Sequence, residues 1–164
     1  MPLLIADTPE QVAIANEIKR QYREIGIEID ARRVPAVELP RELAAHNWTL
    51  ALHSWTDVGA DPDVYALWHS SQADGGTNYA GLRDETIDRT LTAARTQTDE
   101  AERKQHYAQF QRRWAELVPS LPLYEHVLAY DVVEEIARVQ STPSLVVLRA
   151  DRLRVLQHWN VPAR

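Results

Sequence analysis

Short apolar runs alternate with amphipathic stretches along the first third of the chain. Residues 3–5 (LLI) are typical of a buried strand, and residues 8–11 (TPEQ) have the form of a helix-capping box with proline at the first helical position. The following stretch carries its apolar residues on one helical face, and Gly26 suits its carboxyl-terminal cap. Residues 27–34 then alternate between apolar and polar. The pattern predicts a strand–helix–strand unit with two parallel strands.

A second helix is predicted over residues 39–46 and a third strand over residues 48–55. Three strands separated by two helices indicate the α/β class, with an open, mixed, mostly parallel sheet flanked by helices. The third strand runs into an acidic loop within residues 53–71, which restarts as a helical pattern at Val64. Open α/β sheets bind ligands at such loops, so we expect the functional site there.

Helical periodicity returns over residues 82–94 and again after Asp99, which we expect to cap the strongest helix of the chain, with Glu102 reaching back. That helix carries an aromatic stripe, which is more typical of a packed core than of a cofactor site, formed by Tyr107, Phe110, Trp114 and Leu117. Pro119 ends it. Residues 121–130 are predicted to form an edge strand, and residues 145–156 a hairpin.

The composition excludes several classes of function. The 164 residues suit a single domain. The net charge of −6 argues against sequence-independent binding to nucleic acid or to an anionic membrane. The absence of cysteine excludes disulfides, thiolate zinc sites and thiol nucleophiles. We also expect no leader peptide and no membrane span within these residues.

The acidic loop admits two interpretations. Asp57, Asp61 and Asp63, flanked by His53 and His69, could bind a divalent metal, but their spacing matches neither a calcium loop nor a zinc helix. We favour the alternative, in which Asp61 caps the next helix and Pro62 takes its first position. No nucleophile elbow, phosphate-binding glycine loop or triad setting is present in the sequence.

The aromatic residues near this loop also have two interpretations. Helical spacing favours a core position for Tyr65 and Trp68. Trp55 and Tyr79 either fill the core beneath the edge of the sheet, or Trp55 faces a cleft and stacks on a ligand. The pattern alone leaves both positions open for Trp55.

Several short motifs in a fixed order resemble a known family. They are Trp55, Asp61-Pro62-Asp63, Asn78-Tyr79, the stretch LRDETIDR at residues 82–89, AAR at 93–95, AER at 101–103 with Tyr107, and PSLPLY at 119–124. This series resembles the second, carboxyl-terminal lobe of the extracellular solute-binding proteins of family 5, the peptide- and nickel-type receptors of bacterial ABC importers. The resemblance covers the chain from residue 3 to about residue 130.

The resemblance implies a lobe of the periplasmic-binding-protein type II fold, spanning residues 1–164 as a single domain. Residues 127–164 would be a tail that crosses toward a first lobe, which is missing here. In such receptors two lobes close on a ligand and a membrane permease accepts the closed form. The expected location is periplasmic or extracellular, with a lipoprotein anchor possible in the full-length form, whose leader is absent here.

The resemblance also implies the site residues Trp55, Thr56, Asp57 and Val58. In peptide receptors the matching tryptophan lines the cleft, and an aspartate three positions later binds the α-amino group of the peptide. Here Val58 holds that position and the acid is Asp57, one place early. Either Asp57 still anchors the amine, or the ligand is a different solute, such as an oligosaccharide or a nickel chelate.

The leading hypothesis is therefore a lobe that binds a peptide or a similar small solute, without catalysis, cofactor, metal or nucleic acid. One alternative is a metal-dependent enzyme that uses Asp57, Asp61 and Asp63. A second alternative is an interaction domain that self-associates, for which a homodimer of the isolated lobe is possible.

Overall fold

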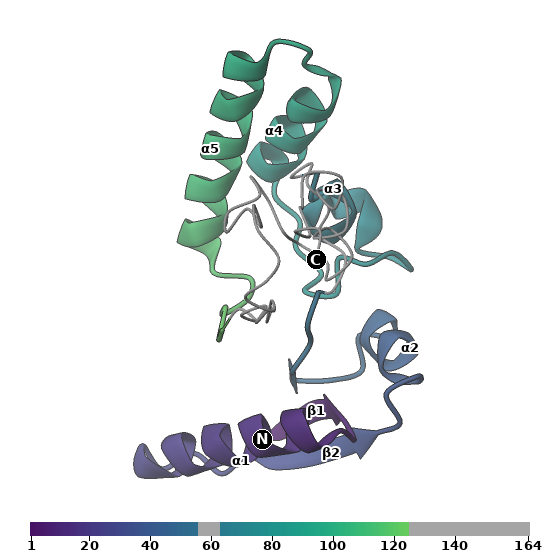
Figure 1. Ribbon diagram of the computed structural model, residues 1–164, viewed down its shortest axis with the longest axis vertical. Helices are drawn as coiled ribbons and strands as arrows, with labels where there is room; N and C mark the ends of the chain where they lie inside the picture. The colour runs from purple at the N-terminus through teal and green to yellow at the C-terminus, as the bar shows by residue number, and fades with distance from the viewer. Residues whose placement is uncertain (56–62, 125–164) are drawn as a thin grey trace, which may run out of the picture. The chain divides into compact units, whose positions relative to one another are not determined.

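The computed structural model describes residues 1–55 and 63–124 (Figure 1). The chain divides into two compact units, Met1–Trp55 with Asp63–Ser120, and Thr56–Pro62 with Leu121–Arg164. Of the second unit the structure describes residues 121–124, which are exposed and belong to no strand. The rest of the predicted edge strand, the predicted hairpin and the predicted tail lie outside the described residues.

The first unit contains a three-stranded parallel sheet. Its strands are β1 (Pro2–Ala6), β2 (Asp30–Val34) and β3 (Leu50–Ala51), in the spatial order β2-β1-β3. Both pairings are parallel, with Leu3 opposite Leu50 and Leu4 opposite Ala51. The predicted α/β class and parallel strand–helix–strand unit are confirmed. The third strand is shorter than predicted: among the described residues, its pairing with β1 ends at Ala51, opposite Leu4.

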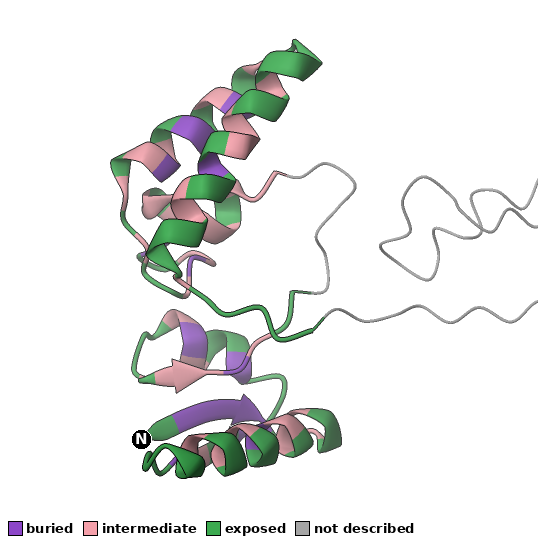
Figure 2. Cartoon of the chain, turned by 90° about the vertical axis from the view of Figure 1, so that its left-hand side faces the viewer, coloured by how far each residue is buried: buried purple, intermediate pink, exposed green. Residues whose placement is uncertain are grey.

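Both faces of β1 are buried, which explains its uninterrupted apolar sequence (Figure 2). On one face Leu3 and Ile5 pack with helix α1 (Pro9–Glu24), and on the other Leu4 and Ala6 pack with helix α2 (Leu39–Ala44). The first face is completed by Ala15, Ile29 and Leu52, and the second by Val34, Leu39 and Leu43.

The predicted caps of α1 form with one change of partner. The Thr8 hydroxyl accepts from the Gln11 backbone N–H at 3.2 Å, as in a capping box. The Gln11 side chain does not close the box; it accepts from the Ala6 N–H at 2.8 Å and so fastens the helix to the end of β1. Gly26 follows the helix at φ +80, the left-handed conformation expected of a carboxyl-terminal cap.

The remaining described elements are helices. They are α3 (Tyr65–Trp68), a 3₁₀ turn η1 (Ser70–Gln72), α4 (Glu85–Thr96) and α5 (Glu100–Leu117). Between α4 and α5 lies a second core of Ile87, Leu91 and Phe110, against which Tyr65, Trp68, Tyr107 and Trp114 pack. The core interpretation is confirmed for these aromatic residues. Leu117, the last member of the predicted stripe, is 38% exposed.

One predicted helix start needs correction, and a second is confirmed. Helix α3 begins at Tyr65, so Pro62 is not its first residue; Asp63 accepts from the Tyr65 N–H at 3.1 Å. Asp61 itself lies outside the described residues. Asp99 caps α5 as predicted, accepting from the Glu102 N–H at 2.9 Å.

Glu102 does not reach back to the Asp99 backbone. The Asp99 N–H donates instead to the Gln97 side-chain oxygen at 3.0 Å, and the Gln97 amide donates to the Glu102 carboxylate. Gln97 therefore lies between the Asp99 backbone N–H and the Glu102 carboxylate, the two groups that a capping box would join directly.

Helix α2 ends two residues before the predicted position. His46 takes a left-handed conformation at φ +51, and its Nε2 lies 2.8 Å from the Ala73 carbonyl oxygen. Helix α5 ends at Leu117 because Val118, which precedes Pro119, is also left-handed at φ +47. None of the helices within the described ranges has both the length and the apolar character that crossing a membrane requires.

Candidate ligand-binding site

The alternation of residues after β3 places His53 on a defined side of the sheet. Leu50 and Leu52 pack with the α1 side, whereas Ala51 packs with the α2 side together with Tyr79. Successive residues of an extended chain point to opposite faces, so His53 and Trp55 are expected on the same side as Ala51. The ring contacts of His53 and Trp55 with Tyr79 agree with this placement.

Three aromatic rings meet at the carboxyl end of β3. The rings of Trp55 and Tyr79 stack nearly parallel, with centroids 5.5 Å apart and an interplanar angle of 6°. The His53 ring stands perpendicular to both, with centroids 4.5 Å from Trp55 and 5.3 Å from Tyr79. We call His53, Trp55 and Tyr79 the aromatic cluster. Trp55 remains 39% exposed, so part of its indole is available to a ligand.

The His53 imidazole has no polar partner in the described part of the chain. Its Nε2 atom is buried and makes no hydrogen bond there. Burial lowers the pKa of His53 below its ordinary value, because desolvation penalises the charged ring. Burial therefore favours the neutral form of the imidazole, which contacts its neighbours mainly as an aromatic ring.

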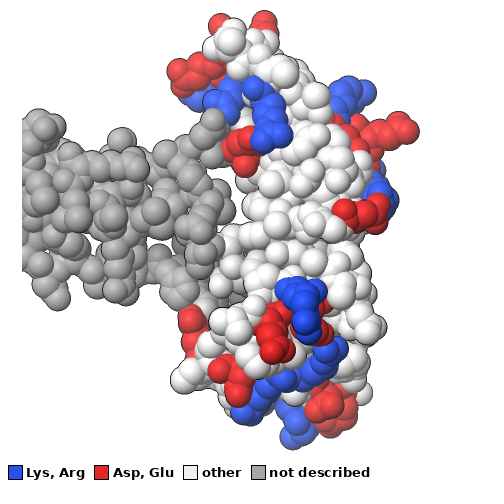
Figure 3. All heavy atoms as spheres, turned by 90° about the vertical axis from the view of Figure 1, so that its right-hand side faces the viewer, with Lys and Arg blue, Asp and Glu red and all other residues white. Residues whose placement is uncertain are grey.

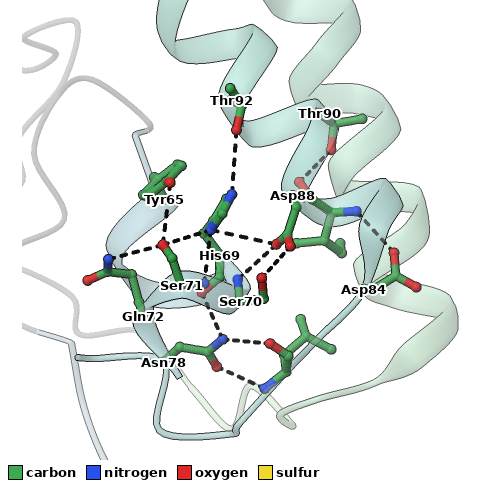
Figure 4. A network of polar contacts seen from close by, with 12 residues as sticks. Tyr65, His69, Ser70, Ser71, Gln72, Asn78, Asp84, Asp88, Thr90 and Thr92 are labelled. Carbon is green, nitrogen blue, oxygen red and sulfur yellow. Dashed lines mark hydrogen bonds and ion pairs between the residues drawn. The ribbon is translucent and has the colours of Figure 1, made fainter. Parts of the chain in front are cut away.

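Tyr79 is held in place by the residue before it. Asn78 is completely buried and donates from Nδ2 to the carbonyl oxygens of His69 at 3.2 Å and Leu82 at 2.8 Å. Its Oδ1 accepts from the Leu82 N–H at 3.1 Å (Figure 4). A buried side chain with three hydrogen bonds fixes the loop on both sides of Tyr79. The Asn78-Tyr79 motif thus joins an anchor to a ring of the cluster.

The predicted site residues stay a prediction. Trp55 lies in the aromatic cluster and is 39% exposed. Thr56, Asp57 and Val58 lie outside the described residues, so their role stays a prediction. The sequence pattern indicates His53 only as a flank of a metal site, and Tyr79 as a core residue near the loop. The spacing of two between His53 and Trp55 was the available signal for their common face.

The described members of the predicted metal site have other partners. Asp63 accepts from the Tyr65 N–H at 3.1 Å and from Arg95 Nε at 2.7 Å. His53 packs in the aromatic cluster, and His69 Nδ1 accepts from the Ser71 N–H in the 3₁₀ turn η1. Within residues 1–55 and 63–124, no group of three metal-binding side chains is assembled. Asp57 and Asp61 lie outside these ranges.

A histidine, an aspartate and two serines gather between η1 and α4 (Figure 4), but they do not form a catalytic triad. His69 Nδ1 accepts from the Ser71 N–H at 3.1 Å and lies 3.8 Å from Asp88. A triad needs the opposite arrangement, with a proton on Nδ1 directed at the acid. Asp88 accepts instead from the Ser70 N–H at 2.8 Å and from the Ser70 hydroxyl. This network attaches the 3₁₀ turn to α4.

Charged side chains of both signs lie beside one another on the face drawn in Figure 3. Ion pairs also form along α1, where Arg20 pairs with Glu17 at 2.6 Å and with Glu24 at 2.5 Å. On this face the structure therefore presents mixed charge rather than a basic patch of the kind that binds nucleic acid.

Comparisons with known proteins identify peptide-binding relatives. The chain is 30% identical over 121 residues to the di/tripeptide-binding protein 2 of Pseudomonas aeruginosa, covering 72% of this chain and 22% of that protein. It is 29% identical over 112 residues to the oligopeptide-binding protein AppA of Bacillus subtilis, covering 68% of this chain and 21% of that protein. No protein-family profile matches the chain.

Solved structures show the same fold. The dipeptide-binding protein of Pseudoalteromonas sp. SM9913, in complex with Met-Leu, matches with a TM-score of 0.67 and 24% identity, over 73% of this chain and 25% of that one. AppA, in complex with a nonapeptide, matches with a TM-score of 0.66 and 24% identity, over 72% of this chain and 24% of that one. The predicted periplasmic-binding-protein fold is confirmed.

The resemblance to the solute-binding proteins of family 5 is also confirmed, since the relatives are oligopeptide- and di/tripeptide-binding proteins. The chain spans only about a fifth of the length of these relatives, 21% and 22%.

Proposed function

We propose that this chain is a lobe of an ABC-importer solute receptor and that its exposed Trp55 forms part of the wall that contacts a peptide or a similar small solute. The observation that carries the proposal is the aromatic cluster, in which Trp55 is stacked on Tyr79 and still 39% exposed. The support from outside the chain is its similarity to peptide-binding proteins.

The geometry suits binding without bond chemistry. An indole supported by a second ring is a rigid apolar surface, and ordering it on a ligand costs little conformational entropy. It stands where the chain leaves a parallel sheet at the carboxyl end of a strand, the usual ligand position in open α/β folds. Stacking and burial of a solute against this surface require no nucleophile, acid or base.

The wider receptor is part of the same proposal. The chain would supply one wall of a cleft, a first lobe would supply the other, and closure of the two would bury the solute. The closed form would then be handed to a membrane permease, outside the cytoplasm. Residues 1–164 would correspond to the second lobe, and residues 127–164 to the segment that returns toward the first.

Nuclear magnetic resonance of the indole groups tests the proposed contact. The chain has five tryptophans, so the ¹⁵N-labelled protein should show five indole N–H resonances, and the one missing from Trp55→Phe belongs to Trp55. We expect the dipeptide Met-Leu or a nonapeptide to shift the Trp55 resonance. One lobe offers only part of a cleft, so the dissociation constant should lie in the millimolar range, on the order of 1 mM.

Trp114 provides the matched control, because it packs in the second core between α4 and α5. Its resonance, identified with Trp114→Phe, should stay in place during the same titration. Maltotriose tests the alternative in which the ligand is not a peptide. The proposed role of Trp55 is refuted if its resonance remains unshifted by both peptides and by the sugar at 10 mM, about ten times the expected dissociation constant.

A further inference from the structure

The ring of Trp55 has two described aromatic neighbours of different origin. Tyr79 comes from the loop between η1 and α4, whereas His53 precedes Trp55 by two residues on the same strand extension. Tyr79 lies parallel to the indole, at 6°, and His53 stands perpendicular to it, at 86°. The two neighbours therefore constrain different movements of the indole.

We propose that His53 is a positioning residue, which holds the Trp55 ring against Tyr79 in the orientation that receives a ligand. This inference rests on the proposed role of Trp55 in binding. In this role His53 acts through Trp55, and its buried Nε2 atom takes no part in binding the solute.

A stacked pair of rings is not fixed by stacking alone. Offset-stacked rings can slide and turn within their common plane at little cost, because the contact changes gradually along that plane. A third ring perpendicular to both blocks this movement. His53 is placed to do so, with its centroid 4.5 Å from Trp55 and 5.3 Å from Tyr79.

The nitrogen atoms of His53 are not what this role requires. The buried Nε2 makes no hydrogen bond in the described part of the chain, so the imidazole carries a polar atom at a cost and uses its ring for packing. Desolvation lowers the pKa of His53. Among the described residues, the phenol of Tyr79 is a titratable group whose ring packs against the imidazole. Because ring packing and not a hydrogen bond carries the proposed role, the phenyl ring of His53→Phe should hold Trp55 in place, whereas the methyl group of His53→Ala should not.

The experiment compares His53→Phe with His53→Ala in the full 164-residue chain. The first readout needs no ligand: the position of the Trp55 indole resonance and the near-ultraviolet circular dichroism of the stacked rings. We expect both signals to be kept in His53→Phe and lost in His53→Ala. His106→Ala is the matched control, since His106 lies on α5 and this variant should leave the Trp55 signals unchanged.

The second readout is the affinity for the dipeptide Met-Leu. We expect His53→Ala to weaken it about three- to tenfold, the factor that corresponds to one aromatic contact, and His53→Phe to keep it within about twofold. Far-ultraviolet circular dichroism and urea unfolding report whether His53→Ala is folded. If it is not, the comparison of His53→Phe with the unchanged chain still decides whether the ring alone is sufficient.

Two results would overturn the inference. One is a Trp55 signal that His53→Ala leaves in place, and the other is a signal that His53→Phe loses as completely as His53→Ala does. Failure of the proposed function has a different signature, because then Met-Leu does not shift the Trp55 resonance in any variant, while the ligand-free signals still respond to the substitutions at His53.

Discussion

Replacing Asn78 by aspartate should destabilise the protein severely while leaving the shape of the side chain unchanged. Asn78 is completely buried, and its Nδ2 group donates to the carbonyl oxygens of His69 at 3.2 Å and Leu82 at 2.8 Å. In the variant an oxygen would face these two oxygens. The bond that Oδ1 accepts from the Leu82 N–H, at 3.1 Å, could remain.

The magnitude follows from the two bonds that are lost. Each is worth about 1 kcal/mol, and the Leu82 carbonyl oxygen also loses its side-chain donor, which adds about 1 kcal/mol. The His69 carbonyl oxygen keeps a second donor, the Gln72 N–H at 3.0 Å. The introduced carboxyl must also bury its charge or take up a proton. We therefore expect Asn78→Asp to lower the free energy of unfolding by about 4 kcal/mol at pH 7, a large part of the stability of a typical domain.

The loss should depend on pH in a definite direction. Burial and the facing carbonyl oxygens raise the pKa of the introduced carboxyl above its value in the unfolded chain. The folded variant then binds more protons than the unfolded one over the interval between these two pKa values. Its stability is greatest below the unfolded pKa, about 4, and falls as the pH rises.

Urea unfolding at pH 4 and pH 7 measures both effects, with Asn47→Asp, at an exposed position, as the control. The control should change the free energy of unfolding by about 0.5 kcal/mol or less. The indole resonance of Trp55 should also move in Asn78→Asp, because the loop that carries Tyr79 loses its anchor. A variant within about 1 kcal/mol of the parent at pH 7 would refute the reasoning.

Substitutions at two further positions test the part of the chain around α4. Asp84 caps α4 through two backbone N–H groups at 3.0 Å and accepts from Arg113 at 3.0 and 2.7 Å, so Asp84→Ala should cost about 2 kcal/mol and Asp84→Asn about half as much in urea unfolding. The guanidinium of Arg113, followed by the backbone N–H groups, lowers the pKa of Asp84. The stabilisation by the Asp84 carboxylate is therefore present above about pH 4 and lost as the pH falls. An equal loss of stability in Asp84→Ala and Asp84→Asn would contradict the division of the effect between the helix cap and the ion pair. Gly76→Ala should cost about 1–3 kcal/mol, because a Cβ there would lie 2.6 Å from the Gln72 carbonyl oxygen; an unchanged melting temperature would contradict the close approach.

The elements that depend on neighbouring residues could be predicted from the sequence. The strand–helix–strand unit follows from local periodicity, and the caps at Thr8, Gly26 and Asp99 follow from residues within one helical turn. The core position of the aromatic stripe on α5 follows from helical spacing. These features need no knowledge of distant contacts, and the ordered motifs were sufficient to indicate the family.

Local reasoning failed where a competing partner lay just outside the pattern. The Gln11 side chain turns to the end of β1, and Gln97 takes the place of Glu102 at the Asp99 backbone. Helix α3 begins at Tyr65 rather than at Pro62. Asp63 accepts hydrogen bonds there from the Tyr65 N–H and from Arg95 on α4. In each case the choice among possible hydrogen bonds depended on which other element came near.

The sequence by itself determined that Trp55 follows an apolar run that enters the sheet and that it precedes an acidic loop. It could not decide whether the indole is core or surface, since both environments suit tryptophan. The tertiary structure decided this, by bringing Tyr79 from more than twenty residues away under one face of the indole and leaving it 39% exposed. That contact depends on the buried hydrogen bonds of Asn78 and on the packing of Tyr79 against the sheet, which no local pattern encodes.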